Sequence, residues 1–300
     1  MRTILLAGST GIIGSFLLNQ FDKEESIIKL SRSNSLIDRD SFSIDLNNKE
    51  QVATFVKHTQ TFDALIFLVG LAHKKGKRKE IKKFQRVNKE TLINLVSSLK
   101  QASKLPKKII FSSTVSVYGE RMDQEIYLEK TELKPLSPYA ITKIEAEQYL
   151  LNNFNTRTWI LRFAPVYAAN FLLNIDRRTK IGNYCFKIGD GKKKLSLCNI
   201  NNIGQSIEGI LKNKVPPGIY NISDKNDYTY NDLLKYVDAK IVFEVPSSLV
   251  KIIYFLGKVT KIIYLKENSI KLLSNNLFPS NKIRKYLNLN SDLNRIQKDD

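Results

Sequence analysis

The chain is poor in the residues that build disulfide and metal sites. Its 300 residues include two cysteines, Cys185 and Cys198, and two histidines, His58 and His73. The cysteines are too far apart for a CxxC pair, and no histidine stands in an acidic or cysteine cluster, so neither a disulfide framework nor a metal site is expected. No segment reaches the ~20 apolar residues that cross a bilayer, and the N-terminus does not resemble a signal peptide. These absences predict a cytoplasmic protein with reduced thiols.

Acidic residues are also few relative to basic ones. Lysine and arginine number 48 against 29 aspartates and glutamates, which gives a net charge of +19. Such a charge suits an anionic substrate, an anionic membrane surface or nucleic acid. The lysines are spread along the chain without aromatic interleaving or a recognisable nucleic-acid module, so nucleic acid is not an expected partner. The densest basic run, residues 73–79, is interpreted as a solvated loop rather than a partner site.

Apolar segments and amphipathic segments alternate through the first half of the chain, without internal repeats. The expected strands are Thr3–Ala7, Ser26–Ser31, Phe42–Asp45, Ala64–Gly70, Lys108–Ser112 and Trp159–Phe163. The expected helices are Ile12–Phe21, Gln51–His58, Ile81–Ala102 and one that contains Tyr139. This alternation predicts an α/β fold with a doubly wound parallel sheet. We expect residues 1–165 to form a dinucleotide-binding domain and residues 166–300 mainly a substrate-binding lobe, with some segments returning to the sheet.

A glycine-rich turn follows the first strand directly, with the spacing Gly-xx-Gly-xx-Gly. Gly8 permits a tight turn, Gly11 lets the backbone approach a pyrophosphate, and Gly14 lets the helix pack closely on the strand. The helix N-terminus adds free amides and the positive end of its dipole. The residues expected at the phosphates are Gly8, Thr10, Gly11, Ile12, Ile13 and Gly14.

Tyr139 and Lys143 stand one helical turn apart, so their side chains share one helix face. An ammonium group and a cationic nicotinamide would both favour the phenolate and lower the pKa of Tyr139 from about 10 toward working pH. Tyr139 would then take a proton from a substrate hydroxyl while hydride leaves the same carbon. The pair therefore predicts a nicotinamide enzyme that uses a tyrosine as its acid and base; the alternative is an ordinary pair on a surface helix.

These motifs resemble the extended short-chain dehydrogenase/reductase family, and within it the sugar-nucleotide epimerase/dehydratase group. The resemblance covers nearly the whole chain and is carried further by residues 44–46, 84–91, 111–119, 161–167 and 218–224. It implies a Rossmann-type fold with a smaller C-terminal substrate lobe. It also implies that Thr114 orients the substrate oxygen, although neighbouring Ser112, Ser113 and Ser116 are alternatives for that role.

The resemblance assigns further residues to the cofactor and the substrate. Lys143 would also bind the nicotinamide ribose, and Asp45 would contact the adenine. The other expected cofactor contacts are Ser31, Arg32, Leu46, Gly70, Asn88 and Pro165. The expected substrate contacts are Val115, Ser116, Tyr118, Asn170 and Lys194.

The choice between NAD and NADP stays open. Members that prefer NAD usually end the second strand with an acidic residue, whereas this strand ends in Ser31 and Arg32. Arg32 would bind the 2′-phosphate of NADP as a bidentate partner, or else stack on the adenine of NAD. The balance slightly favours NADP.

The residues after Thr114 narrow the reaction. The Asp-Glu pair of the 4,6-dehydratases is replaced by Val115-Ser116, and Ser116 also stands where the combined 3,5-epimerase/4-reductases need a cysteine. What remains is hydride and proton transfer at one carbon, expected to be C4 of a uridine diphosphate (UDP) sugar made for a surface polysaccharide. An arginine that clamps the diphosphate in relatives is missing near residues 192–197, where Lys194 is its substitute. The alternatives are a non-catalytic dinucleotide-binding sensor or assembly factor, and a reductase of a non-sugar carbonyl.

One late segment suggests a further partner. Residues 248–265 are expected to form a single helix after Pro246, apolar except for a narrow polar stripe of Lys251, Tyr254, Lys258 and Lys261. Such a helix would lie in a membrane interface, or else belong to the substrate lobe or a dimer interface. A homodimer through two long helices is the oligomer that the family resemblance suggests.

Overall fold

The computed structural model describes residues 2–21, 25–32, 40–71 and 77–293. The chain divides into two compact units. The sheet unit consists of Met1–Thr114, Ser137–Arg162 and Ile207–Ile219; the second unit consists of Val115–Leu136, Phe163–Ser206 and Tyr220–Asp300. Residues 73–76 of the basic run lie outside the described residues.

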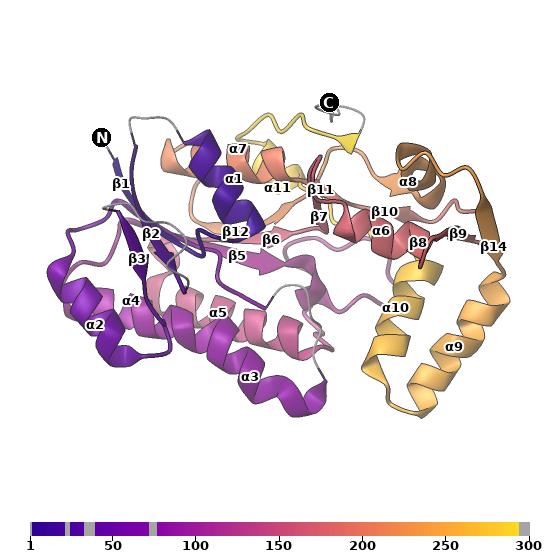
Figure 1. The fold of residues 1–300 in the computed structure, drawn as a ribbon, viewed down its shortest axis with the longest axis horizontal. Helices are drawn as coiled ribbons and strands as arrows, with labels where there is room; N and C mark the ends of the chain where they lie inside the picture. Colours follow the sequence, from indigo (N-terminus) through magenta and orange to yellow (C-terminus); the bar gives the residue numbers. More distant parts are fainter. Residues whose placement is uncertain (1, 22–24, 33–39, 72–76, 294–300) are drawn as a thin grey trace. The chain divides into compact units, whose positions relative to one another are not determined.

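A seven-stranded sheet organises the sheet unit, in the order β12-β6-β5-β4-β1-β2-β3 (Figure 1). Its strands are β1 (Arg2–Ala7), β2 (Glu25–Ser31), β3 (Ser41–Ser43), β4 (Ala64–Phe67), β5 (Lys108–Thr114), β6 (Thr158–Phe163) and β12 (Gly218–Ile222). From β5 to β3 every neighbouring pair is parallel. The chain runs outward from β1 to β3 and then returns to β4 on the other side of β1. The predicted doubly wound, Rossmann-type sheet is confirmed, and the change of direction falls between β1 and β4.

The central strands lack polar alternation because both of their faces are covered. All four residues of β4 are buried, as are Ile4, Leu5, Leu6 and Ala7 of β1. Burying one such aliphatic side chain stabilises the fold by about 1.5–3 kcal/mol relative to leaving it in water. The sheet is therefore a rigid platform, and the residues just beyond its strand ends are held in fixed positions.

Helices cover both faces of this sheet, with α1 on one side and α2, α3, α4 and α5 on the other (Figure 1). They are α1 (Ile12–Gln20), α2 (Lys49–His58), α3 (Ile81–Gln85), α4 (Thr91–Gln101) and α5 (Pro138–Phe154). Asn48 begins α2, since its Oδ1 accepts from the amides of Glu50 and Gln51, each at 3.1 Å. Short helical turns are η1 (Arg78–Glu80), η3 (Val115–Tyr118) and η4 (Asn155–Arg157).

The long helix expected over residues 81–102 is present but not uniform. Between α3 and α4 lies one π-helical stretch, η2 (Arg86–Glu90). Such bulges are frequent at functional sites because they rotate one side chain out of the helical register. Here the stretch contains Asn88, which is fully buried.

The second unit is built from short strands and helices. Its strands are β7 (Val166–Tyr167), β8 (Lys180–Ile181), β9 (Tyr184–Ile188), β10 (Lys194–Leu195), β11 (Cys198–Asn199), β13 (Tyr228–Thr229) and β14 (Val242–Val245). They pair as β7 with β11, β10 with β13, and β14-β9-β8. Its helices are α6 (Leu173–Thr179), α8 (Tyr230–Tyr236), α9 (Ser247–Val259), α10 (Ile263–Leu273) and α11 (Asn281–Arg284), and α7 (Ile200–Leu211) passes from this unit into the sheet unit.

The prediction of one helix over residues 248–265 is wrong. The chain forms two helices, α9 and α10, because it reverses at residues 260–262, where Lys261 adopts a left-handed conformation with φ +57°. Gly257 permits the tight return, since a Cβ there would lie 2.8 Å from the Lys266 amide nitrogen. Among the described residues, no helix is long and apolar enough to cross a membrane.

Candidate active site

The glycine turn lies between β1 and α1, at the carboxyl end of the central strand. Gly8 has φ +90°, a conformation that glycine adopts without strain, and its amide donates to the Leu30 carbonyl at 2.9 Å. A Cβ on Gly14 would collide with the Gly8 carbonyl and lie 2.8 Å from Ser9 Cα. Gly11 is different, because a Cβ there would meet only the Gly8 carbonyl, at 3.4 Å. Gly8 and Gly14 therefore shape the turn, while Gly11 leaves its outer side open to a ligand.

The other predicted cofactor residues of this region lie around the same strand ends. Thr10 and Ile12 are exposed beside Gly11, and Ile13 is half-buried in the first turn of α1. Ser31 ends β2, and Arg32, which follows it, is exposed. Free amides at this helix start attract anions, so the turn has the geometry of a phosphate site.

Asp45 and Leu46 follow β3 in the turn before α2. The Asp45 carboxylate accepts from the Asn47 amide at 3.0 Å and from the Asn47 side chain at 3.1 Å. The backbone hydrogen bond from Asn47 is the largest influence that lowers the pKa of Asp45, and the charges of Arg86 and Arg32 add to it. This carboxylate therefore stays ionised near neutral pH. Leu46 is buried beneath it.

Lys143 lies in the interior of the sheet unit, where α5 passes the ends of β4 and β5. Its Nζ donates to the Ser112 carbonyl at 2.9 Å and to the Val69 carbonyl at 3.4 Å. A Cβ on Gly70 would lie 3.1 Å from Nζ, so the bare backbone there makes room for the lysine. The predicted residues Gly70 and Lys143 are thus brought together by this arrangement.

Asn88 joins the loop after β4 to α5. Its Oδ1 accepts from the Leu71 amide at 2.8 Å, and its Nδ2 donates to Thr142 Oγ1 at 3.0 Å. Thr142 in turn donates to the Pro138 carbonyl at 2.8 Å. The buried asparagine therefore fixes the start of α5 against the loop that carries Gly70.

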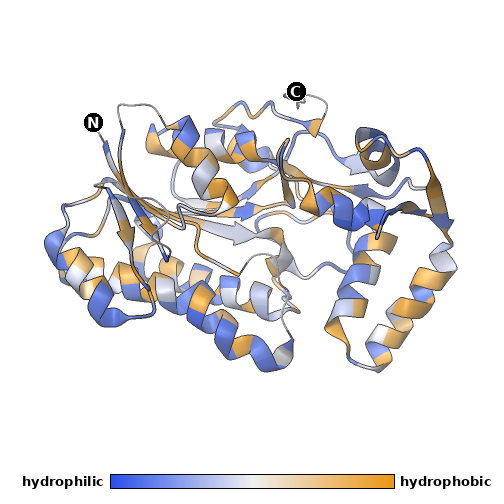
Figure 2. Ribbon diagram, in the orientation of Figure 1, coloured by the Kyte–Doolittle hydropathy of each residue, from blue (hydrophilic) through white to orange (hydrophobic). Residues whose placement is uncertain are grey.

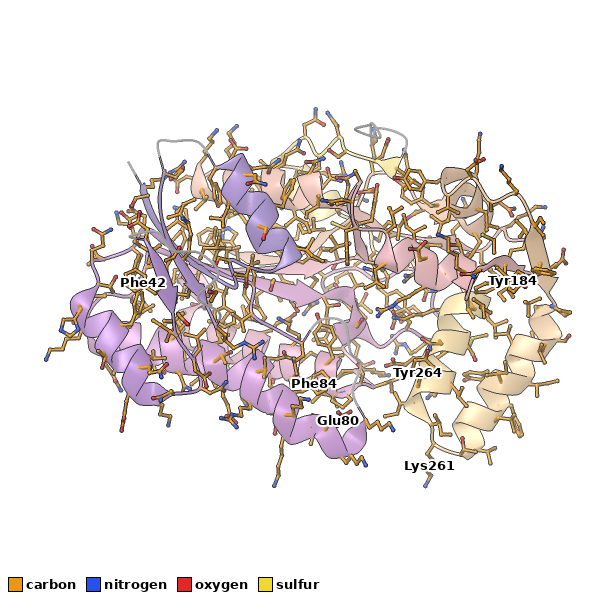
Figure 3. The ribbon with its side chains drawn as sticks, viewed as in Figure 1. Phe42, Glu80, Phe84, Tyr184, Lys261 and Tyr264 are labelled. Atoms are coloured by element: carbon orange, nitrogen blue, oxygen red, sulfur yellow. The ribbon has the colours of Figure 1, made fainter. Side chains whose placement is uncertain are left out.

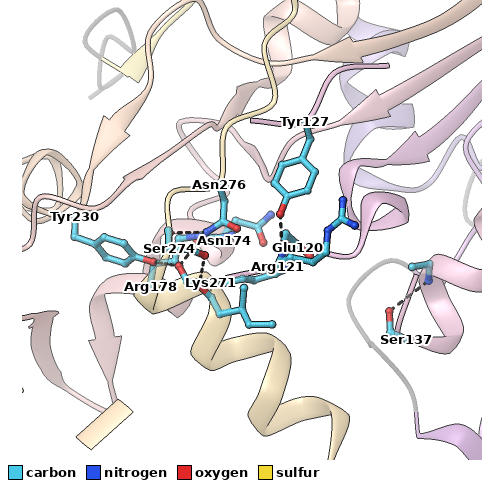
Figure 4. Close-up of polar contacts among 12 residues, drawn as sticks. Glu120, Arg121, Tyr127, Ser137, Asn174, Arg178, Tyr230, Lys271, Ser274 and Asn276 are labelled. Carbon is cyan, nitrogen blue, oxygen red and sulfur yellow. Dashed lines mark hydrogen bonds and ion pairs between the residues drawn. The ribbon is translucent and has the colours of Figure 1, made fainter. Parts of the chain in front are cut away.

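Tyr139 stands in the first turn of α5, and its phenol forms a side-chain hydrogen bond with Thr114 at the end of β5. Ser137 caps the helix, with Oγ accepting from the Ala140 amide at 3.4 Å (Figure 4), and Pro138 provides the fixed φ that suits a first helical position. The three predicted catalytic residues, Tyr139, Lys143 and Thr114, consequently lie in one region of the sheet unit.

The pKa of Tyr139 differs from the sequence-based expectation. Burial raises it to about 12 in the protein alone, and the hydrogen bond with Thr114 only partly lowers it. The phenol is therefore protonated at neutral pH in the protein alone. A lowered pKa requires additional positive charge, and for the complex with a cationic nicotinamide it stays a prediction.

A buried ion pair beneath these residues was not anticipated from the sequence. Glu147, one turn beyond Lys143 on α5, binds the Arg162 guanidinium of β6 through two hydrogen bonds of 3.1 and 2.6 Å. Ser113 Oγ donates to the same carboxylate. Both charged side chains are only 2 % exposed. This cluster ties α5 to β5 and β6, one helical turn beyond Lys143.

We expect Lys143 to titrate far below an ordinary lysine. Burial lowers its pKa from 10.5 to about 7, although the charge of Glu147 partly raises it again. Because the folded protein holds this proton less tightly than the unfolded chain, the stability linked to Lys143 is present above about pH 10.5 and is lost as the pH falls through about 7.

The measurement is an NMR titration of the labelled lysine Cε signals, with the Lys143 signal assigned by its absence in Lys143→Arg. We expect a midpoint near 7 for Lys143. A midpoint of about 10.4, the value of a lysine in water, would contradict the burial of its Nζ.

The predicted substrate residues belong to the second unit. Val115 and Tyr118 are buried in η3, and the Tyr118 hydroxyl donates to Asn221 at 2.6 Å. Tyr118 therefore packs in the interior of the unit. Asn170 and Lys194 are exposed, and Ser116 is half-buried. Pro165, predicted at the cofactor, also lies in this unit and accepts the Cys198 amide at 3.0 Å.

The second unit holds a charged cluster that sequence reasoning missed (Figure 4). Lys271 of α10 forms a 2.9 Å ion pair with the buried Glu120. Burial lowers the pKa of Arg178 on α6, whereas the negative charge of Glu120 raises it in part. The cluster joins two cations to one carboxylate and so favours an anionic partner. In the sequence, only the basic residues of α6 indicate this cluster, because Glu120 and Lys271 are distant from α6 along the chain.

The described residues contain no group of three or more histidine, cysteine, aspartate or glutamate side chains placed to hold a metal ion. Both described cysteines are free; Cys185 is partly exposed, and burial raises the pKa of the Cys198 thiol.

The parallel sheet, the glycine turn at its central strand and the Tyr-Lys helix define a Rossmann-type α/β protein. The profile of the NAD dependent epimerase/dehydratase family matches residues 4–223. The chain belongs to this family.

Besides the family match, the chain is similar in sequence to individual proteins and similar in fold to solved structures. The chain is 31 % identical over 185 residues to the Bacillus subtilis (strain 168) protein described as an uncharacterized UDP-glucose epimerase, YtcB. That alignment covers 55 % of this chain and 56 % of the relative, so the chain matches little more than half of the relative's length.

Solved structures share the fold over almost the entire chain. The UDP-Glc/GlcNAc 4-epimerase of Campylobacter jejuni has a TM-score of 0.76 at 19 % identity, covering 99 % of this chain and 97 % of that one. The UDP-glucuronic acid 4-epimerase of Bacillus cereus, solved in complex with NAD, has a TM-score of 0.73 at 18 % identity, covering 99 % and 94 %. At these identities the likeness establishes the fold.

Proposed function

We propose that the protein is a nicotinamide-dependent enzyme acting at C4 of a nucleotide-diphosphate sugar, as a 4-epimerase or a 4-keto reductase. Residues 1–165 would bind the dinucleotide, and residues 166–300 mainly the sugar nucleotide. The product would supply a surface polysaccharide. The single observation that carries this proposal is the hydrogen-bonded pair Tyr139–Thr114 with Lys143 one helical turn away.

The sheet unit fits a dinucleotide. Gly11 leaves the outer side of the turn open, and the first turn of α1 presents free amides where a pyrophosphate would bind. Gly70 keeps the backbone next to Lys143 free of side-chain atoms. When bound there, a nicotinamide would accept a hydride from the sugar carbon and return it. NAD is the cofactor in the complex of the Bacillus cereus relative, and we leave NADP as the alternative that Ser31 and Arg32 suggest.

The chain's own residues would handle the proton. Tyr139 Oη would remove the proton of the sugar hydroxyl during oxidation and give it back during reduction. Thr114 Oγ1, already bonded to the phenol, would orient the substrate oxygen. Lys143 would hold the ribose and, in its protonated form, place a positive charge near the phenol.

An anionic sugar nucleotide is supported by charge as well as by relatives. Arg178 and Lys271 give the cluster in the second unit two cations for the one carboxylate of Glu120. Two relatives carry UDP-sugar activities in their descriptions. We therefore propose a UDP-sugar as the substrate class.

The test follows absorbance of the reduced nicotinamide while NAD, NADP, NADH and NADPH are offered with UDP-sugars and their 4-keto forms. Net consumption of NADH or NADPH with a keto sugar identifies a reductase. Interconversion of two UDP-sugars without net cofactor change identifies an epimerase. Dinucleotide binding without any turnover would reject the proposal and favour a sensor or assembly factor of the same fold.

A further inference from the structure

The hairpin of α9 and α10 exposes an unusual number of large apolar side chains. We define its outer face by seven residues, each 46–64 % exposed: Leu249, Ile252, Phe255, Leu256, Val259, Ile262 and Tyr264. Figure 2 shows α9 coloured as apolar over much of its surface. Single exposed apolar residues are ordinary, but a cluster of this kind marks an interaction site.

The inner side of the same hairpin packs against other residues of the second unit. Val250 is 3 % exposed and packs in a small core with Phe186, Ile188 and Leu273. The exposed Ile252, Phe255, Leu256 and Val259 follow the spacing i, i+3, i+4 and i+7, which places them in one stripe along α9. The stripe therefore points away from the unit that anchors the hairpin.

The apolar surface continues onto the small sheet that precedes α9. Ile241 directly precedes β14 and Phe243 lies in it, separated from α9 by Glu244, Val245 and Pro246; their side chains are 72 % and 52 % exposed. Phe243 contacts the exposed Tyr184 of β9, with ring centroids 5.5 Å apart. The outer face is thus broader than one helix.

The charge of the hairpin indicates which kind of partner binds the outer face. The hairpin, residues 247–273, contains five lysines (Lys251, Lys258, Lys261, Lys266 and Lys271) and one acidic residue, Glu267, which is buried. Lys261 lies at the turn between the helices, and the exposed Tyr264 lies in the first turn of α10 (Figure 3). Lysine stems lie along apolar surface while their ammonium groups reach toward water, and tyrosine prefers the boundary between apolar and polar layers.

A second copy of the chain fits this face poorly. A two-fold dimer brings the same patch of both partners together, so lysines would face lysines, and the exposed carboxylate of the adjoining strand, Glu244, already pairs with Lys187 at 3.8 Å. An anionic lipid surface supplies the missing negative charge and accepts the apolar stripe. The 13 residues of α9 extend only about 20 Å, too short to cross the ~30 Å hydrocarbon core, so the helix would lie in the surface plane.

We propose that the α9–α10 hairpin is a peripheral membrane anchor. It inserts Ile252, Phe255 and their neighbours into the acyl boundary of an anionic leaflet, while its lysines bind the lipid headgroups. The proposal is independent of the proposed catalytic activity, because no residue of the outer face belongs to the candidate active site.

The test is co-sedimentation of the full chain with vesicles of phosphatidylcholine alone or with about 30 % phosphatidylglycerol, at low and high salt. We expect binding to the anionic vesicles at low salt and weaker binding at high salt. Ile252→Ser/Phe255→Ser and Lys251→Glu/Lys258→Glu should each weaken binding by more than about tenfold.

Matched controls come from exposed residues elsewhere in the second unit. Ile126→Ser removes an apolar side chain that is 53 % exposed outside the hairpin, and Lys225→Glu/Lys285→Glu makes the same charge change. Both should bind vesicles like the unchanged protein, and lipid-free thermal unfolding verifies that every variant folds.

Two results would overturn the proposal. One is equal loss of binding in the controls, which would indicate only a diffuse attraction of the basic protein to lipid. The other is absence of vesicle binding together with a lipid-free dimer that Ile252→Ser/Phe255→Ser converts to monomers, which would assign the outer face to a second copy.

Discussion

Replacing Tyr139 by phenylalanine should lower turnover by about 10²–10⁴-fold while leaving dinucleotide binding unchanged. The substitution removes only the hydroxyl that is bonded to Thr114, and the ring keeps its place in the first turn of α5. Because the hydroxyl carries the proton in the proposed reaction, its loss affects the chemical step rather than the glycine turn. Turnover is measured with the productive UDP-sugar, and binding is measured by titrating the dinucleotide against protein fluorescence.

The same helix offers a matched control. Tyr149 also lies on α5, and its hydroxyl bonds Ser97 at 3.0 Å, within the sheet unit and away from Thr114. Tyr149→Phe makes the identical chemical change and should retain turnover within a few fold. If Tyr139→Phe keeps full activity, or if the two variants lose activity equally, Tyr139 is not the acid and base.

The second large effect is expected at the buried ion pair. Arg162→Met leaves the Glu147 carboxylate in the interior without its ion-pair partner, while the Ser113 hydroxyl remains bonded to it. Breaking a buried pair by removing one partner costs about 3–5 kcal/mol of the free energy of unfolding. The single tryptophan, Trp159, lies on the same strand with its Nε1 bonded to the Val215 carbonyl at 3.0 Å, so urea unfolding followed by its fluorescence measures the loss in the sheet unit.

Two comparisons make this result specific. Glu147→Leu/Arg162→Met removes both charges and should recover most of the lost stability, since an apolar pair no longer leaves a charge unpaired. Glu208→Gln breaks the exposed pair between Glu208 of α7 and Lys212, the residue after this helix, and should change stability by at most about 1 kcal/mol. A loss in Arg162→Met no larger than in Glu208→Gln would show that the pair contributes little.

The features that the sequence predicted well are those whose chemistry is encoded locally. Gly8, Gly11 and Gly14 follow an apolar strand within seven residues, and Tyr139 and Lys143 lie one turn apart on a single helix. Their placement needs only strand and helix geometry. The parallel sheet followed for the same reason, because each of its central strands is an uninterrupted apolar run.

The features that escaped prediction depend on contacts between distant segments. Glu147 meets Arg162 and Ser113 from two different strands, and its position four residues after Lys143 was the only hint. The reversal at Lys261 was missed because a left-handed lysine carries no glycine or asparagine signal. The two-residue strands of the second unit, such as β10 and β11, are too short for any periodic pattern to indicate them.

The sheet unit is discontinuous along the chain, which constrains how it folds during synthesis and where the protein can be truncated. Its third segment, Ile207–Ile219, carries the start of β12, the strand that borders β6 at the edge of the sheet. During synthesis the first 165 residues therefore leave the ribosome with β6 as an open edge, which stays uncovered until more than fifty further residues have followed. An excised fragment that ends at residue 165 would keep that edge permanently and would tend to aggregate through it. A fragment designed for expression must therefore extend beyond β12.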